Sequence, residues 1–120
     1  MSNVVGNWSM TSDWGCDGSI TGSWTQTFKA DGTWSSTPFV HSGRWFQVEG
    51  LVIWTFNDTP NLVYSVNLSG SWMAGAQGYE TAGGQKGCCG GHRSGVPGLM
   101  TTITAKAAAG AADPSVGKKG

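Results

Sequence analysis

The residues best suited to chemistry lie in the stretch GQKGCCGGHR, residues 84–93. It holds the adjacent cysteines Cys88 and Cys89 and the nearby His92, and the remaining cysteine of the chain, Cys16, lies far away in sequence. These groups suit a metal site, a reactive thiol or a disulfide. Structural zinc usually takes four Cys or His ligands in paired spacings. The set is therefore only a weak metal candidate, and no cofactor is expected.

A disulfide is the favoured use of the cysteines. A bond from Cys16 to Cys88 or Cys89 would stabilise a small domain by about 2–4 kcal/mol. The third cysteine would then be free or would link subunits. A nucleophilic cysteine needs a lowered pKa and a base such as His92 held close to it. A glycine-rich loop does not hold two groups that firmly.

No other arrangement of residues predicts catalysis. The acidic residues fall at turns or on strand faces expected to meet solvent, so no acid–base pair stands out. His41 follows Pro38 in a turn region and is also expected to face solvent. The chain has no G-x-S-x-G, P-loop or dinucleotide motif. We therefore assign no catalytic residue.

The balance of charges in the chain indicates which classes of partner it is suited to bind. Seven Lys and Arg balance seven Asp and Glu, which leaves no basic stripe for nucleic acid. No apolar run approaches the roughly 20 residues that cross a bilayer. The first residues lack the features of a signal peptide, and the compartment stays open. Charged residues make up 12% of the chain, about half the usual share, which favours self-association into a homo-oligomer.

Apolar residues alternate with polar ones over residues 6–76, as in half-buried strands. Large aromatic residues recur about every ten positions, the length of a short strand plus a turn. Asp31-Gly32 and Glu49-Gly50 are typical of hairpin turns. The expected strands are residues 6–14, 19–29, 33–39, 42–48, 51–57, 62–68, 71–77 and 99–104.

Eight short antiparallel strands predict an all-β fold closed into an up-and-down barrel, because closure removes exposed edges. A sandwich of the same strands is the rival. We expect one domain over residues 1–105, with a long Gly- and Cys-rich loop at 78–98. Residues 106–120 are expected to form a flexible C-terminal tail.

The opening Gly6-Asn7-Trp8 resembles the G-x-W signature of lipocalin-like barrels of the calycin superfamily. The stretch from Trp14 to Gly18 and the hairpin from Ser42 to Phe56 are similar to those of small bacterial lipocalin-like domains. The resemblance spans about residues 5–105. It implies a barrel whose narrow end is closed by Trp8 and whose mouth holds a small ligand. The same group includes a few isomerases and cyclases.

Within that group the length is similar to that of the avidins, and Trp54 and Ser65 fall near where avidin pocket residues would lie. Avidins need further tryptophans and an aspartate on their last strands. No tryptophan follows Trp72 in this chain. Biotin binding is therefore not expected.

We predict a non-catalytic protein that binds one small, largely apolar or amphipathic molecule in the barrel mouth. Trp8, Trp24 and Trp54 are expected to be mainly structural. The aromatic and polar residues predicted to bind the ligand are Trp14, Trp34, Trp45, Trp72, Gln26, Ser36 and Gln47. The alternatives are a surface that binds carbohydrate, like a lectin, and a self-assembling structural β domain.

Overall fold

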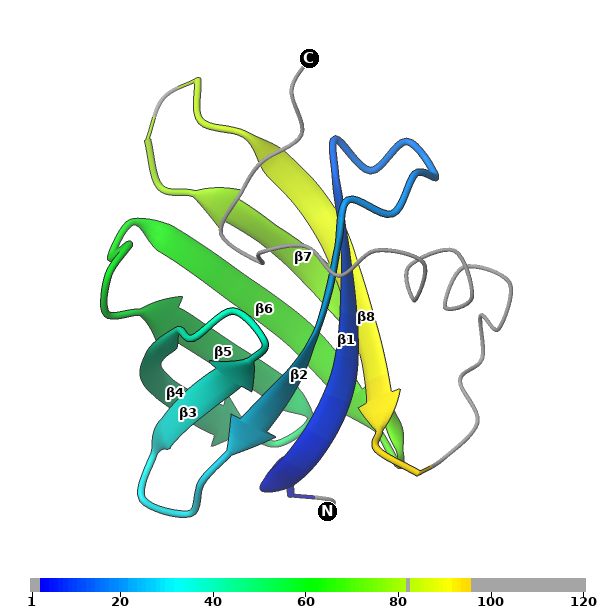
Figure 1. Cartoon of the computed structure of the whole chain (residues 1–120), viewed down its shortest axis with the longest axis vertical. Coiled ribbons are helices and arrows are strands. Elements are labelled where there is room, and N and C mark those ends of the chain that lie inside the picture. Colours follow the sequence, from blue (N-terminus) through cyan, green and yellow to red (C-terminus); the bar gives the residue numbers. More distant parts are fainter. Residues whose placement is uncertain (1–2, 82, 96–120) are drawn as a thin grey trace.

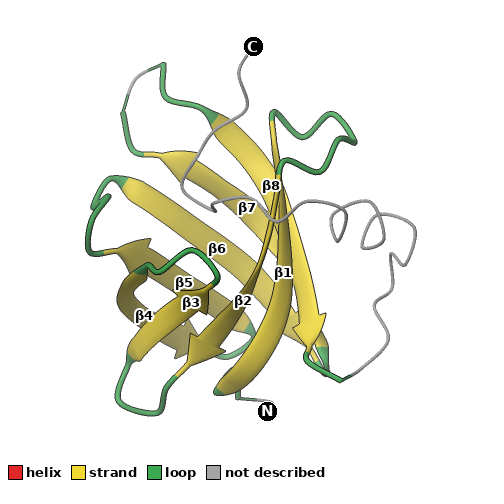
Figure 2. Cartoon of the chain, viewed as in Figure 1, coloured by secondary structure: helices red, strands yellow, loops and turns green. Residues whose placement is uncertain are grey.

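The computed structural model describes residues 3–81 and 83–95. Eight antiparallel strands form a closed barrel in which each strand pairs with its neighbour in sequence and β8 pairs with β1 (Figure 1). The strands are β1 (Gly6–Trp14), β2 (Gly22–Phe28), β3 (Thr33–Thr37), β4 (Ser42–Val48), β5 (Leu51–Phe56), β6 (Leu62–Ser69), β7 (Trp72–Tyr79) and β8 (Lys86–Arg93). The predicted all-β barrel is confirmed, and the described residues hold no helix (Figure 2).

The barrel encloses a core made largely of aromatic side chains. In β2, Trp24, Gln26 and Phe28 are buried, and the Ser and Thr residues between them are partly exposed. This alternation arises because successive side chains of a strand point to opposite faces. The buried core residues are Val4, Trp8, Met10, Trp14, Trp24, Phe28, Trp34, Val52, Trp54, Phe56, Leu62, Tyr64, Val66, Met73 and Cys89.

The two ends of the barrel differ in their connections. At one end, the short-turn end, residues 29–32, 49–50 and 70–71 join the strands. At the other, the long-loop end, the connections are residues 15–21, 38–41, 57–61 and the β7–β8 loop (Figure 2). Among the described residues there is no helix long and apolar enough to span a membrane.

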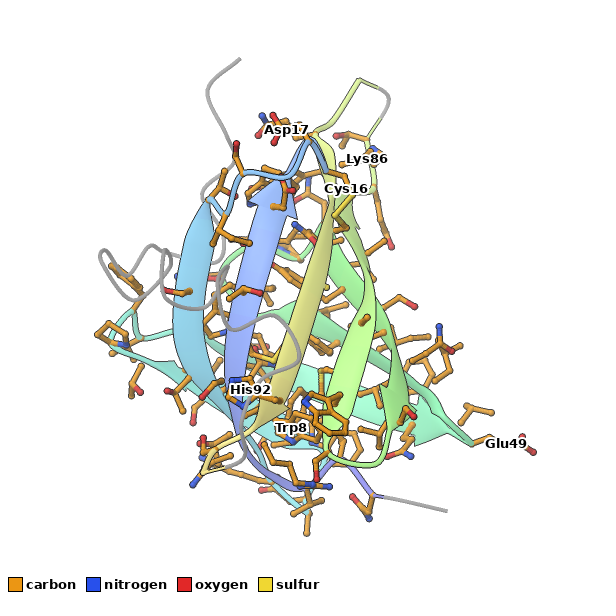
Figure 3. All side chains as sticks on the ribbon, turned by 90° about the vertical axis from the view of Figure 1, so that its right-hand side faces the viewer. Trp8, Cys16, Asp17, Glu49, Lys86 and His92 are labelled. Carbon is orange, nitrogen blue, oxygen red and sulfur yellow. A yellow bond between two sulfur atoms is a disulfide. The ribbon has the colours of Figure 1, made fainter. Side chains whose placement is uncertain are left out.

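Trp8 is fully buried at the short-turn end, opposite Cys16 (Figure 3). Its indole Nε1 donates to the Val4 carbonyl at 2.8 Å. The Arg93 guanidinium lies 4.6 Å from the centre of the Trp8 ring, and its Nη1 donates to the Val5 carbonyl at 3.1 Å. These contacts tie the segment before β1 to the end of β8 at this end of the barrel.

The eighth strand is not where the sequence predicted it. Residues 86–93, predicted to lie in a long loop, form β8 and pair with both β1 and β7. That prediction was wrong because glycine weakens an isolated strand and usually marks a loop. The predicted strand at 99–104 and the tail at 106–120 lie outside the described residues. The first seven strands agree with prediction to within about three residues at each end.

Small residues on β8 leave space for large neighbours. A Cβ at Gly87 would lie 2.7 Å from Nε2 of Gln77, and one at Gly91 would overlap the sulfur of Met10. Since real Cβ atoms do not approach this closely, side chains at these positions would push the neighbouring strands apart. The glycines made β8 hard to predict from the sequence, and they are also the residues that allow the barrel to close around bulky side chains.

Gly43 plays a similar part on β4. The Trp34 indole crosses β4 at this point, and its Nε1 donates to the Thr55 carbonyl at 2.9 Å. A Cβ at Gly43 would lie 2.7 Å from Trp34 Nε1 and would overlap the Thr55 oxygen. The hydrogen bond between β3 and β5 depends on glycine at this position.

We therefore expect Gly43→Ala to lower the free energy of unfolding by about 3 kcal/mol, as overpacking does. Urea denaturation followed by tryptophan fluorescence measures the change. Gly50→Ala is the matched control, because its Cβ would come no closer than 3.5 Å to the Leu68 oxygen. Equal stability of the two variants would contradict this account of Gly43.

Candidate ligand-binding site

The barrel interior holds buried polar side-chain atoms with no hydrogen-bond partner in the described part of the chain. They are Ser12 Oγ, Trp14 Nε1, Gln26 Nε2, Trp54 Nε1 and both Nε2 and Oε1 of Gln77. Each side chain lies on the inward face of its strand. A buried polar group without a partner costs about 1–3 kcal/mol. These atoms are therefore the candidate hydrogen-bonding partners for a molecule held inside the barrel.

Three of these residues lie together where β7, β8 and β1 run side by side. Gln77 and Trp14 are both register partners of Gly87, one on each side of β8. Ser12 lies two residues before Trp14 on the same face of β1, and its register partner on β8 is Cys89. Because Gly87 has no side chain, the Gln77 amide lies against β8 beside Trp14. We call Ser12, Trp14, Gln77 and Gly87 the Gln77 site.

Tyr79 and the first loop hold Trp14 in place. The rings of Trp14 and Tyr79 stack at 5.5 Å with an interplanar angle of 20°. The Trp14 backbone N–H donates to Thr21 Oγ1 at 3.0 Å. The Asp13 carboxylate accepts from the N–H groups of Asp17 and Gly18, at 3.2 and 2.7 Å. One wall of the Gln77 site is thus fixed by a folded loop.

Gln26 and Trp54 lie deeper, among the central aromatic rings. Trp24 Nε1 donates to Gln26 Oε1 at 2.9 Å, so the oxygen of this amide is used and its Nε2 is not. Trp54 stacks on Tyr64 at 5.1 Å, and Tyr64 meets the edge of Trp24 at 6.0 Å. These contacts place both unpaired N–H groups within one aromatic cluster.

Donors outnumber acceptors among the unpaired atoms. The indole N–H groups of Trp14 and Trp54 and the NH₂ groups of Gln26 and Gln77 only donate, the Ser12 hydroxyl does both, and Gln77 Oε1 accepts. None of these side chains is charged. The arrangement is chemically suited to hold an uncharged molecule that offers acceptor oxygens or nitrogens and a flat apolar surface.

Two predicted ligand residues, Trp34 and Trp45, use their polar atoms within the protein. The Trp34 indole is bonded to Thr55, as described above. The Trp45 indole Nε1 donates to the carbonyls of Lys29 and Thr33, at 2.9 and 3.0 Å. Both bonds join strands or turns to one another, so neither indole N–H is free to bind a ligand.

Two predicted polar residues are engaged in the same way. Ser36 Oγ donates to the Phe39 carbonyl at 2.5 Å and so shapes the turn that follows β3. Gln47 Oε1 accepts from the Val4 N–H at 3.1 Å, and its Nε2 donates to the Glu49 carbonyl at 2.6 Å. Of the predicted set, Trp14 and Gln26 are the residues with unpaired interior atoms.

Trp72 lies on the outer face of β7 and is not gathered with the other residues predicted to bind a ligand in the barrel mouth. It alternates with the buried Met73, and its register partners are Ser69 and His92. The prediction missed Gln77 and Tyr79, which end the same strand. The period-two series Met73, Gly75, Gln77 and Tyr79 could have revealed them if the Ala and Gly residues between had been assigned to the outer face.

The cysteines form the predicted disulfide, and the bond joins Cys16 to Cys88 (Figure 3). Cys89 is free and faces the interior, on the opposite side of β8 from Cys88. Adjacent residues of a strand cannot point to one place, so Cys88, Cys89 and His92 are not gathered into a metal site. Within the described residues no group of three potential metal ligands occurs.

His41 does not face solvent as predicted. Its side chain is 10% exposed, and its Nδ1 lies 2.7 Å from Asp58 Oδ2. The ring also meets the edge of Phe56, with 5.6 Å between the ring centroids. The neighbouring Ser36 hydroxyl accepts from the His41 backbone N–H at 3.2 Å and donates to Phe39. This hydroxyl is tied to the backbone and is not aimed at a substrate.

Comparisons of the chain with protein-family models, with curated proteins and with solved structures give no match. The closed eight-stranded antiparallel barrel is compatible with a lipocalin-like fold.

The disulfide joins residues 72 positions apart, so its loss should lower the free energy of unfolding by about 4 kcal/mol. We expect this fall for the double variant Cys16→Ser, Cys88→Ser in urea denaturation. Cys89→Ala, which keeps the bond, is the control. A peptide map of the unreduced protein with Cys89 in the disulfide would contradict this pairing.

Burial raises the pKa of the Cys89 thiol from 9.0 to about 12. Above pH 9 the unfolded chain loses this proton while the native state keeps it, so the contribution of the thiol to stability falls as the pH rises from 9 towards 12. We therefore expect the unfolding free energy of wild type, relative to that of Cys89→Ala, to fall as the pH rises from 9 towards 12. A difference that is constant with pH would show that Cys89 is not buried as described.

Proposed function

We propose that this chain is a non-catalytic, lipocalin-like binding protein that encloses one small, uncharged and largely planar molecule bearing carbonyl-type acceptors. The observation that carries the proposal is the set of unpaired polar atoms inside an otherwise aromatic core. A core evolved only for packing would place apolar side chains at those positions, because each unpaired polar atom lowers stability.

The chemistry of the atoms defines the ligand class. Three of the groups only donate, namely the indole N–H groups of Trp14 and Trp54 and the NH₂ group of Gln26. The ligand must therefore offer acceptor atoms to them. The Gln77 amide, with both its donor and its acceptor unpaired, matches a group that offers a carbonyl beside an N–H or O–H. Stacked and edge-on aromatic rings around these atoms favour a flat apolar body.

The chain is proposed to hold its ligand without changing it chemically. The Cys89 thiol stays protonated at neutral pH because burial raises its pKa to about 12. The Ser36 hydroxyl donates to the Phe39 carbonyl, although His41 and Asp58 lie nearby. Neither group is arranged as a nucleophile.

Exchange of the ligand should be slow. Trp14 is fully buried and Gln77 is 3% exposed, so a ligand reaches the Gln77 site only when the long-loop end opens. A ligand bound during expression should then survive purification. Native mass spectrometry of the untreated protein would detect it as an added mass of a few hundred daltons.

The decisive test replaces Gln77 with methionine, which has a similar size and no amide. We expect Gln77→Met to bind xanthone, an uncharged planar aromatic ketone, at least tenfold more weakly than wild type in a tryptophan-fluorescence titration, a loss of about 1.4 kcal/mol. The free variant should be at least as stable as wild type, because removing an unpaired buried amide relieves its cost.

Gln47→Met is the matched control. It removes an amide that is bonded to Val4 and Glu49, so it should lower stability and leave xanthone binding unchanged. Wild-type protein that carries no added mass and does not bind xanthone would refute the proposed ligand class. Equal binding by wild type and Gln77→Met would show that the Gln77 site does not contact the ligand.

A further inference from the structure

The outer face of the β4–β5 hairpin carries an apolar patch. Phe46 and Val48 on β4 are 54% and 59% exposed, and Leu51 on β5 is 36% exposed. Phe46 pairs with Ile53, and Val48 pairs with Leu51, so the four side chains adjoin across the hairpin. We call these four residues the hairpin patch. Large contiguous apolar surfaces on a soluble domain usually mark a site of association.

Opposite charges lie at the two ends of this patch. Arg44 precedes Phe46 on the same face of β4 and is exposed. Glu49 lies in the β4–β5 turn at the other end, with a φ of 54°, and projects from the edge of the barrel (Figure 3). Neither side chain forms an ion pair with another described residue. The hairpin patch is therefore an apolar stripe with a positive end and a negative end.

We propose that the hairpin patch binds a second copy of this chain. A closed barrel has no free strand edge, so two copies associate through their outer faces. In a two-fold dimer the same patch meets itself. This inference is independent of the proposed ligand, because it concerns the outside of the barrel.

The charges select the direction of the two-fold axis. An axis in the interface that runs across the strands reverses β4 of one copy relative to the other. Arg44 of each protomer then lies over Glu49 of the partner subunit, and the apolar side chains cover each other. An axis along the strands would set Arg44 against Arg44 and Glu49 against Glu49, which is repulsive. The charge pattern thus favours an antiparallel dimer.

The surroundings of the patch also favour a second copy over other occupants. The chain has no net charge, so two copies do not repel each other as they approach. An anionic membrane would be recognised by several basic residues. The hairpin patch has the basic Arg44 at one end and the acidic Glu49 at the other. The arrangement is self-complementary.

Sedimentation equilibrium over a wide range of protein concentration tests the proposal. We expect wild type to dimerise, and Arg44→Glu and Glu49→Arg each to weaken the dimer at least tenfold, because each leaves like charges facing across the interface. The double variant Arg44→Glu, Glu49→Arg restores the opposite pairing and should recover the wild-type constant. Phe46→Ser should give a monomer.

Glu80→Arg is the matched control, since it makes the same change of charge at the long-loop end, away from the patch. Circular dichroism and thermal unfolding establish that each variant is folded. A wild-type protein that stays monomeric at the highest concentration overturns the proposal. So does a dimer that survives Phe46→Ser, or a double variant as weak as the single ones.

Discussion

The room inside a closed barrel of eight strands is the constraint on which the rest of this structure depends. Such a barrel is just wide enough for side chains to fill it or for one small ligand to enter. Here most of the filling is aromatic, and strand spacing cannot grow to accommodate it because the ladder of hydrogen bonds is closed. Space comes instead from inward-facing small residues such as Gly43, Gly87 and Gly91. The large aromatic side chains can therefore pack inside the barrel only because glycines face them.

The same constraint explains what the sequence could and could not predict. Alternation and the regular recurrence of aromatic residues located the first seven strands, because those signals are local. The eighth strand was missed because its glycines have meaning only beside Met10 and Gln77, which are distant in sequence. Along Lys86–Arg93 the glycines disfavour a strand when the segment is considered alone, whereas packing against the neighbouring strands requires them.

The candidate site was only partly predictable for a related reason. Trp14 and Gln26 were identified from their inward position. Trp34 and Trp45 share that position, yet their N–H groups reach carbonyls on other strands and turns. Whether a buried N–H finds a carbonyl depends on how strands cross, which a period-two pattern does not contain. Whether an inward-facing tryptophan has a free or a bonded N–H is therefore known only from the three-dimensional structure.

The pairing of β1 with β8 has a consequence for how the chain is made. Contacts between the first and the last strand have a large sequence separation, which slows folding. During synthesis β1 leaves the ribosome early, whereas the strand that covers its edge, and the thiol that Cys16 needs, emerge after most of the barrel has been translated. Until then the nascent sheet has two open edges, which are prone to pair with other chains. The interval before β8 is made is therefore the stage at which the chain is most exposed to aggregation.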